Sequence, residues 1–299
     1  MFRLVNTIYH FEVGEPEAKQ RLDTFIFDRI GALSRLYLTR KINAGACFVN
    51  AAIKLAGYKL KNGDVVEITL DADAPTSMMP EEMPLEIIFE DDEILIVNKA
   101  AGILVHPTSS VKSGTLLNAL AFHLNPKPES QSPKCKTVRA GLVHRLDKET
   151  SGLLVIAKTS RSHRILSNHF QRKLIKKLYF AVVETVVAQD FGTINAPIAR
   201  VDDSIPHWRI VENGKAATTN FKVIERRETS TLLELEPVTG RTNQLRIHCQ
   251  SRGFPIVGDE IYGAKPFKRL CLHAAKLSFF HPNGGWREFE TGLPEDFQS

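Results

Sequence analysis

The sequence lacks long hydrophobic runs and paired cysteines, and these absences exclude several classes of protein. No apolar segment of the 299-residue chain approaches the length of about 20 residues that a membrane-spanning helix needs. The cysteines are far apart and show neither the paired spacing of a zinc site nor a disulfide framework. We therefore expect no membrane partner, no metal, and reduced thiols, some of them in the core, at Cys47, Cys135, Cys249 and Cys271.

Internal repeats and low-complexity tracts are also absent from the sequence. Its N-terminus reaches the polar residues Asn6, Tyr9 and His10 too soon to form the apolar core of a signal peptide. Hydrophobic residues make up 43% of the chain and charged residues 24%, as in ordinary globular proteins. These features predict a soluble, cytoplasmic protein with one large domain, or with one medium and one small domain.

Positive charge is absent from one internal segment, and this absence marks a domain boundary. Residues 71–93 contain nine Asp and Glu but no Lys or Arg, whereas residues 1–70 carry a net charge of +3. The stretch from 71 to 84 also holds three prolines, which prevent helix formation. We predict a small module over residues 1–72, an acidic linker over 73–84 and a second domain over 85–299.

The basic parts on either side of that segment favour polyanionic partners. Residues 94–299 carry a net charge of +11, and the whole chain carries +5. A generically basic protein without an anionic partner is the alternative, and charge alone does not exclude it.

The first 72 residues predict a small α/β module. Apolar residues recur at helical spacing from Leu22 to Ile30, and a second helix is expected between Ser34, as its N-cap, and Gly45. Apolar residues at 66, 68 and 70 alternate as in a half-buried strand. Three basic side chains on or beside the second helix suit contacts with RNA phosphates, although a solvated helix face is the simpler explanation: Arg35, Arg40 and Lys41.

The most informative stretch of the chain runs from His144 to Gly152. It lies between two apolar runs, 142–143 and 153–157, which predict strands. An Arg, an Asp, a Lys and a Glu therefore share one strand-to-strand loop, with Asp147 near its middle. Such a loop can aim a carboxylate at a substrate while the scaffold stays rigid. The same charges could also simply keep a surface turn soluble, and the loop alone does not decide between the two.

The rest of the second domain alternates short apolar runs with few long helices. Strands are expected over 94–97, 178–183 and 232–235, and a helix is expected to begin with Ser160 as its cap. Residues 125–136 hold three prolines and predict an exposed excursion. Many strands with few helices predict an α+β fold with a mixed, largely antiparallel β-sheet.

The order of short signals in the first module resembles the S-four-like RNA-binding module over roughly residues 19–70. The signals are Arg21-Leu22-Asp23, Ser34-Arg35, Gly45, Val49-Asn50 and Gly63-Asp64-Val65-Val66. Their order is more specific than any one of them. The resemblance implies that residues 1–72 bind RNA.

The second domain resembles the RluA family of pseudouridine synthases from about Leu85 to about Pro282. Its most specific motifs are His144-Arg145-Leu146-Asp147 with Thr150-Ser151-Gly152-Leu153-Leu154, and Gly240-Arg241-Thr242 with Gln244-Leu245-Arg246-Ile247-His248. An S-four-like module ahead of such a domain is an arrangement that this family often shows. The resemblance implies the pseudouridine synthase fold and the isomerisation of uridine to pseudouridine in RNA. No redox step or energy input is needed, so no cofactor is implied.

The resemblance assigns catalysis to three residues. Asp147 would be the catalytic carboxylate, which is ionised at neutral pH and can serve as nucleophile and leaving group. Tyr179 would stack on the uracil and transfer a proton, while Arg246 would pair with Asp147 and keep it ionised. Attack on the sugar, attack on the ring and a glycal route stay open, and an ordinary strand aromatic is the alternative for Tyr179.

Other residues would bind the RNA. The target uridine must be flipped out of a helix to reach a pocket, and Arg145 would fill the vacated space, with a phosphate contact as its alternative. Arg241 is the second candidate for the role of Arg246, or a phosphate contact. Leu245 and Ile247 would form an apolar floor under the base.

Two positions depart from the family pattern. Ala100 follows Lys99 where proline is usual, and Asn243 stands where histidine is usual. Neither carries a group assigned to chemistry, so both bear on target identity rather than on activity. His144 and His248 are expected to be structural, because neither has a metal-ligand partner at helical or turn spacing.

Two other functions stay open as alternatives. An inert catalytic domain would make the protein an RNA-binding or ribosome-assembly factor, but such a factor has no need of Asp147, Tyr179 and Arg246 together. A carboxylate-based glycoside hydrolase usually needs two facing carboxylates, and Glu149 is the only near candidate. We expect ribosomal RNA as the substrate, transfer RNA as the alternative, no DNA partner, and a monomer.

Overall fold

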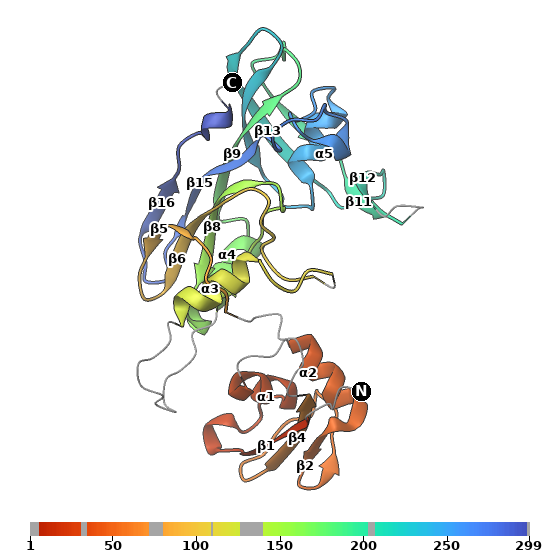
Figure 1. Cartoon of the computed structure of the whole chain (residues 1–299), viewed down its shortest axis with the longest axis vertical. Helices are drawn as coiled ribbons and strands as arrows, with labels where there is room; N and C mark the ends of the chain where they lie inside the picture. The colour runs from red at the N-terminus through yellow and green to blue at the C-terminus, as the bar shows by residue number, and fades with distance from the viewer. Residues whose placement is uncertain are drawn as a thin grey trace. The chain divides into compact units, whose positions relative to one another are not determined.

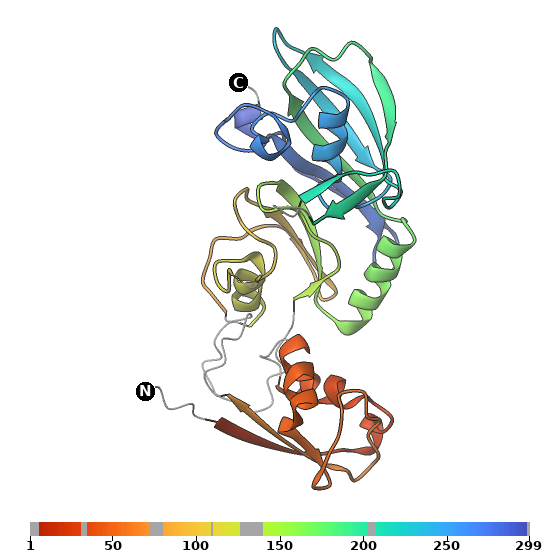
Figure 2. The ribbon, with the colours of Figure 1, turned by 90° about the vertical axis from the view of Figure 1, so that its right-hand side faces the viewer.

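The computed structural model describes residues 6–30, 35–71, 80–108, 110–125, 140–202 and 207–297. The chain divides into two compact units, which Figures 1 and 2 show as ribbons. Unit 1 comprises Met1–Met83 and His106–Arg139, and unit 2 comprises Pro84–Val105 and Ala140–Ser299. Most of the predicted linker 73–84 and of the excursion 125–136 lies outside the described residues, and the predicted domain bounds stay a prediction.

Unit 1 contains a four-stranded antiparallel sheet in the order β1-β4-β2-β3. Alternating residues of β4 turn Val66, Ile68 and Leu70 inward, where they join the apolar face of the first helix in one core. The helix over 22–30 and the strand over 66–70 are thus confirmed. The elements are β1 (Asn6–Glu12), a 3-10 turn (Glu15–Glu17), α1 (Leu22–Ile30), α2 (Arg35–Lys41), a π turn (Ile42–Ala46), β2 (Cys47–Val49), β3 (Ala52–Ile53), β4 (Val65–Asp71) and α3 (Leu116–Leu124).

The second helix ends as the sequence indicates. Gly45 adopts a φ of 86°, a left-handed conformation that favours glycine, and β2 begins two residues later. The predicted N-cap Ser34 lies outside the described residues.

Unit 2 is built on a ten-stranded mixed sheet. Its main path is β10-β13-β14-β9-β15-β8-β6-β5, with β16 paired to β15 and β7 paired to β8. Among the described strands, these pairings are antiparallel except that of β8 with β15, which is parallel. The predicted α+β class with a mixed, largely antiparallel sheet is confirmed.

The elements of unit 2 agree with the predicted strands over 94–97, 178–183 and 232–235. Figure 1 shows α4 beside β8, and α5 packs against β12, β13 and β14. The elements are β5 (Glu86–Glu90), β6 (Ile94–Lys99), β7 (Gly141–Leu142), β8 (Ser151–Ala157), α4 (Ser160–Gln171), β9 (Lys176–Val183), β10 (Phe191–Asn195), β11 (Ile198–Val201), β12 (His207–Ile210), β13 (Thr218–Arg226), β14 (Thr231–Pro237), α5 (Gln244–Ser251), β15 (Leu272–Phe280) and β16 (Trp286–Glu290), with 3-10 turns at Glu260–Tyr262 and Glu295–Phe297.

The centre of the unit 2 sheet is fully enclosed. All seven residues of β8 are buried, and its apolar side chains pack with those of β6 and with Leu166 of α4. At the start of β8, Gly152 has a φ of 116°, and a Cβ there would lie 2.3 Å from the carbonyl oxygen of Ala274. Only glycine at position 152 allows β15 to approach this closely. This contact fixes the start of β8, and with it the end of the loop that precedes β8.

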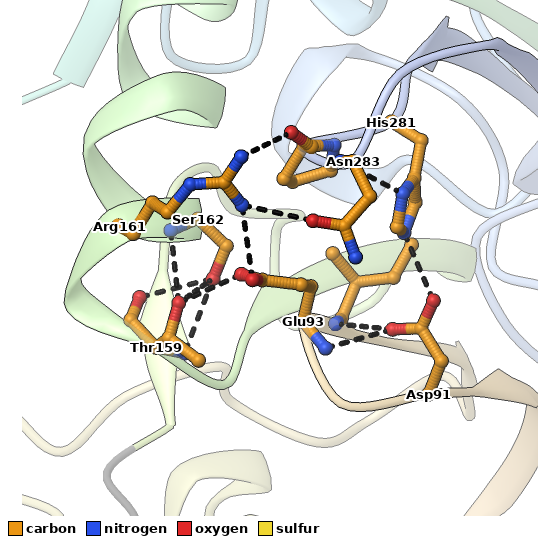
Figure 3. A network of polar contacts seen from close by, with 9 residues as sticks. Asp91, Glu93, Thr159, Arg161, Ser162, His281 and Asn283 are labelled. Carbon is orange, nitrogen blue, oxygen red and sulfur yellow. Dashed lines mark hydrogen bonds and ion pairs between the residues drawn. The ribbon is translucent and has the colours of Figure 1, made fainter.

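A polar network fixes the start of α4 (Figure 3). Ser160 was expected to cap this helix, but the cap is Thr159, whose Oγ1 accepts a hydrogen bond from the Ser162 nitrogen at 3.0 Å. The cap residue needs extended backbone, and Ser160 already lies inside the helix.

The same network joins two turns of unit 2 to the start of α4. Arg161 donates to the Glu93 carboxylate at 3.0 Å and to the Pro282 carbonyl at 2.9 Å. His281 Nε2 lies 3.0 Å from the Asp91 carboxylate. The β5–β6 turn, the start of α4 and the β15–β16 turn are therefore held together, as Figure 3 shows.

Candidate active site

A cleft of about 770 Å³ opens in unit 2 at the loop between β7 and β8. Side chains from this loop, from β9 and from the start of α5 line it. The structure thus brings together six predicted site residues from three separate parts of the sequence: Arg145, Asp147, Tyr179, Arg241, Leu245 and Arg246.

The loop that carries Asp147 is held mainly through its backbone. The Asp147 carbonyl accepts a hydrogen bond from the Thr150 nitrogen at 3.2 Å, and the Lys148 carbonyl accepts one from the Gly102 nitrogen at 2.9 Å. Leu146 is buried beside it and anchors the loop by packing. The backbone contacts leave the Asp147 side chain free to face the cleft.

Lys99 reinforces the loop from the end of β6. This side chain is 2% exposed, and its Nζ donates to the carbonyls of Ala100 at 2.7 Å, Ile103 at 2.9 Å and Lys148 at 2.9 Å. Burial lowers the pKa of Lys99 to about 8. No local sequence pattern indicates a role for Lys99, because the Lys148 carbonyl that it contacts lies 49 residues further along the chain.

The Asp147 carboxylate accepts no hydrogen bond from the described residues and lies among charged groups. Burial raises the pKa of Asp147, and the positive charges of Arg246, Arg145 and Lys99 oppose this rise. Asp259 adds a negative charge that raises it further. A partly buried carboxylate without a fixed partner is available to a substrate.

Tyr179 projects from β9 into the same cleft. Burial, and after it the charge of Asp147, raises the pKa of Tyr179. The phenol therefore stays protonated at neutral pH and can donate a hydrogen bond or a proton.

Arg246 does not form the direct ion pair with Asp147 that we expected. Its guanidinium makes a bidentate pair with Asp259, with Nε to Oδ2 at 2.7 Å and Nη2 to Oδ1 at 2.6 Å. Both side chains are buried. Arg246 acts on Asp147 through its charge, and it is the strongest of the groups that lower the pKa of that carboxyl.

The remaining predicted residues of α5 divide between two sides of the helix. Leu245 lines the cleft, whereas Ile247 packs with Ile198 and Ala217 in a separate cluster. Positions two apart on a helix point about 200° from each other, so the two cannot form one floor. Arg241, just before α5, lines the cleft and donates from Nε to the Ala216 carbonyl at 3.1 Å.

His144 and His248 form hydrogen bonds within the fold, in agreement with the structural role expected for both. His144 Nε2 accepts from the Val155 nitrogen at 3.0 Å, and burial lowers the pKa of His144 to about 3. His248 contacts Thr219 Oγ1 at 2.9 Å and the Ala196 carbonyl at 3.0 Å. Among the described residues, no group of three or more His, Cys, Asp or Glu is arranged to hold a metal ion.

Several cleft residues had no role in the sequence prediction. Lys173, Lys176 and Lys177 line the cleft where α4 passes into β9, and the first two are exposed. The available signal was the concentration of basic residues between 172 and 177. Thr150 also lines the cleft, and its hydroxyl is buried without a hydrogen-bond partner among the described residues.

The basic residues predicted in the first module lie on α2 or directly at its end. Arg40 is exposed, and Lys41 Nζ lies 5.7 Å from the centre of the Tyr37 ring. The side chain of Arg35 lies outside the described residues. An RNA-binding role for these three residues stays a prediction. No helix in the described part of the chain is long and apolar enough to cross a membrane.

Comparison with known proteins identifies the family of the chain. Residues 93–251 match the family model described as RNA pseudouridylate synthase. An uncharacterized RNA pseudouridine synthase of Bacillus subtilis is 37% identical and covers 95% of this chain and 93% of its own. Ribosomal large subunit pseudouridine synthase D of Pseudomonas aeruginosa is 35% identical and covers 96% of this chain and 91% of its own.

Solved structures agree with the fold of most of the chain. Human RNA pseudouridylate synthase domain containing 1 superposes with a TM-score of 0.59 at 26% identity, covering 72% of this chain and 86% of that chain. Human RNA pseudouridylate synthase domain containing 4 gives a TM-score of 0.58 at 25% identity, covering 71% and 90%. The chain therefore belongs to the RluA family of RNA pseudouridine synthases.

Proposed function

We propose that this enzyme converts specific uridines of ribosomal RNA to pseudouridine, with Asp147 as the catalytic carboxylate. The observation that carries the proposal is the meeting of Asp147, Tyr179 and Arg246 in one cleft of unit 2. The choice of ribosomal RNA is supported by several relatives of about the same length that are named ribosomal large subunit pseudouridine synthase D.

The reaction changes the uracil atom to which C1′ of the ribose is bonded. The bond from C1′ to N1 breaks, the uracil turns, and a bond from C1′ to C5 forms. The proton on C5 is lost and N1 gains one, so the reaction balances without a redox partner. Asp147 assists the bond exchange as nucleophile or base. A carboxylate is ionised at neutral pH, which suits both roles, and as a nucleophile it also departs readily.

Tyr179 and Arg246 support that step. The Tyr179 ring stacks on the uracil, and its protonated hydroxyl lies in the cleft where a proton must move. Arg246 supplies positive charge beside the carboxylate without occupying it.

The target base must leave its stack to reach Asp147. The exposed Arg145 side chain stands on the same loop and enters the space that the base vacates, since a guanidinium can stack and hydrogen-bond at once. Lys173 and Lys176 on the rim contact phosphates of the flanking strand.

The test is Asp147→Asn in cells that lack the native gene, with chemical mapping of pseudouridine across all RNA. We expect the wild-type gene to restore pseudouridine at specific ribosomal positions and the variant to restore none. Purified variant should still bind the target RNA, because the substitution removes no phosphate contact. Modification by the variant at the wild-type rate contradicts the proposed role of Asp147, and restored sites only in transfer RNA contradict the proposed substrate.

A further inference from the structure

The guanidinium of Arg246 is fixed on several sides behind the cleft. Asp259 binds it through both carboxylate oxygens, and the ring of Tyr262 lies under it at 5.0 Å from centroid to guanidinium carbon. Asn243 Oδ1 adds a longer contact of 3.4 Å to Nη1. These contacts leave the guanidinium little freedom to turn toward any other carboxylate.

Asp259 is itself held in place. Its side chain is fully enclosed and caps the 3-10 turn Glu260–Tyr262, where it also accepts a hydrogen bond from the Tyr262 nitrogen. The preceding Gly258 has a φ of 77°, and a Cβ there would lie 2.1 Å from the Arg269 carbonyl oxygen. This close packing fixes the turn that presents the carboxylate to Arg246.

Asn243 and Tyr262 close the arrangement. The Asn243 amide donates to the Tyr262 hydroxyl at 3.0 Å, and that hydroxyl donates to the Trp208 carbonyl at 3.0 Å. Asn243 has a φ of 54°, a left-handed conformation that asparagine tolerates better than most residues. An asparagine at this position therefore serves both the backbone turn before α5 and the clamp on Arg246.

The clamp matters because of what Arg246 would otherwise do. A free guanidinium beside an unpartnered carboxylate forms a bidentate pair, which would occupy the oxygens that the substrate needs. Asp259 satisfies the guanidinium from behind. Asp147 keeps a positive neighbour, and its oxygens accept no hydrogen bond from the described residues.

We propose that Asp259 is a positioning residue for the isomerisation, which holds Arg246 beside Asp147 rather than on it, with Asn243 and Tyr262 completing the clamp. This inference rests on the proposed catalytic role of Asp147. The charged and titratable groups that face Asp147 are Arg145 on its own loop, Lys99 on β6, Tyr179 on β9, Arg246 on α5, and Asp259 and Tyr262 on the turn.

The first test is Asp259→Asn, which keeps the shape of the side chain and removes its charge. We expect kcat to fall by up to about 100-fold, the loss expected when a catalytic group shifts by about 1 Å, with KM for the RNA nearly unchanged. Because Asp259 raises the pKa of Asp147, its neutralisation should also move the acid limb of the kcat/KM profile to lower pH.

Asn243→Asp is the opposing variant. It keeps the side-chain shape and adds a negative charge next to Arg246, and it also removes the amide donor to the Tyr262 hydroxyl. The acid limb should then move to higher pH, opposite to the shift in Asp259→Asn. The opposite shifts follow from the removed and the added charge alone, so the fall in kcat is the readout that tests the positioning of Arg246. The Asn243 variant keeps the test open if Asp259→Asn fails to fold.

The matched control is Asp296→Asn. Asp296 forms a second bidentate pair with an arginine of unit 2, Arg269, but neither residue lines the cleft. We expect its kcat and acid limb to match the wild type. Wild-type kcat and pH profiles in both clamp variants would overturn the inference. If Asp147→Asn is inactive in the same assay, the proposed function survives that result, whereas an active Asp147→Asn contradicts the proposed function itself.

Discussion

Two carboxylates near the cleft of unit 2 are held in opposite ways. Asp259 is enclosed and bound by Arg246 and by the Tyr262 nitrogen, whereas Asp147 is fixed through its backbone and receives no hydrogen bond at its carboxylate from the described residues. Burying a charge without a partner is costly, and proteins rarely keep such a group without a use for it. The comparison separates a carboxylate that holds the structure from one that is available for chemistry.

The largest expected effect is on stability, when the Asp259 carboxylate is removed. Asp259→Ala leaves the Arg246 guanidinium buried and unpaired, so we expect a loss of about 3–5 kcal/mol in the free energy of unfolding. Urea unfolding followed by tryptophan fluorescence measures this change in unit 2, because both tryptophans of the chain, Trp208 and Trp286, lie there.

The control for that measurement is Asp296→Ala, which breaks the other bidentate pair of unit 2. The Asp296 side chain is 28% exposed and that of Asp259 is fully enclosed, so the Asp296 variant should lose less stability. An equal or smaller loss in Asp259→Ala would show that the clamp does not hold the turn as the contacts indicate.

A second, smaller effect concerns the backbone support of Asp147. Lys99→Met keeps an unbranched side chain but removes the Nζ donor from three carbonyls, of which, among the described residues, only the Lys148 carbonyl keeps a second donor, the Gly102 nitrogen, so we expect a loss of about 1–3 kcal/mol in stability. Because the Lys148 carbonyl is one of them, kcat should fall while RNA binding is retained. The matched control is Lys158→Met, which removes a less buried lysine of the same unit, from outside the cleft. Unchanged kcat in Lys99→Met would mean that the remaining contacts hold the loop.

The sequence predicts the local part of this picture and misses most of the long-range part. The period-two pattern of β4, the apolar runs of β6, β8 and β9, and the charged loop between strands follow from neighbouring residues. The grouping of Asp147, Tyr179 and Arg246 came from the family resemblance, because no periodicity links residues so far apart.

Three predictions, one taken from the family resemblance and two from residue types and local patterns, differ from the structure for physical reasons. The partner of Arg246 is Asp259, which lies beyond the end of α5 in a turn whose path the sequence does not reveal. Ile247 faces away from the cleft because its segment is helical, which a residue-type argument about an apolar floor cannot see. The cap of α4 is Thr159 rather than Ser160, since cap assignment depends on one residue's backbone angles.

The smallest expected effect is the pH dependence of the free energy of unfolding that Asp147 causes. Burial raises the pKa of Asp147 in the folded chain above its ordinary value, so the folded state binds more protons between the two values. Stability from this group is therefore present at low pH and is lost as pH rises through the raised pKa. Asp147→Asn cannot ionise and should be as stable as the wild type below that window and slightly more stable above it. Urea unfolding of both proteins from pH 3 to pH 8, with Glu149→Gln as the matched neighbour on the same loop, measures the difference. A wild type more stable than Asp147→Asn at neutral pH would mean that the Asp147 carboxylate has a stabilising partner, and the contrast with Asp259 would then fail.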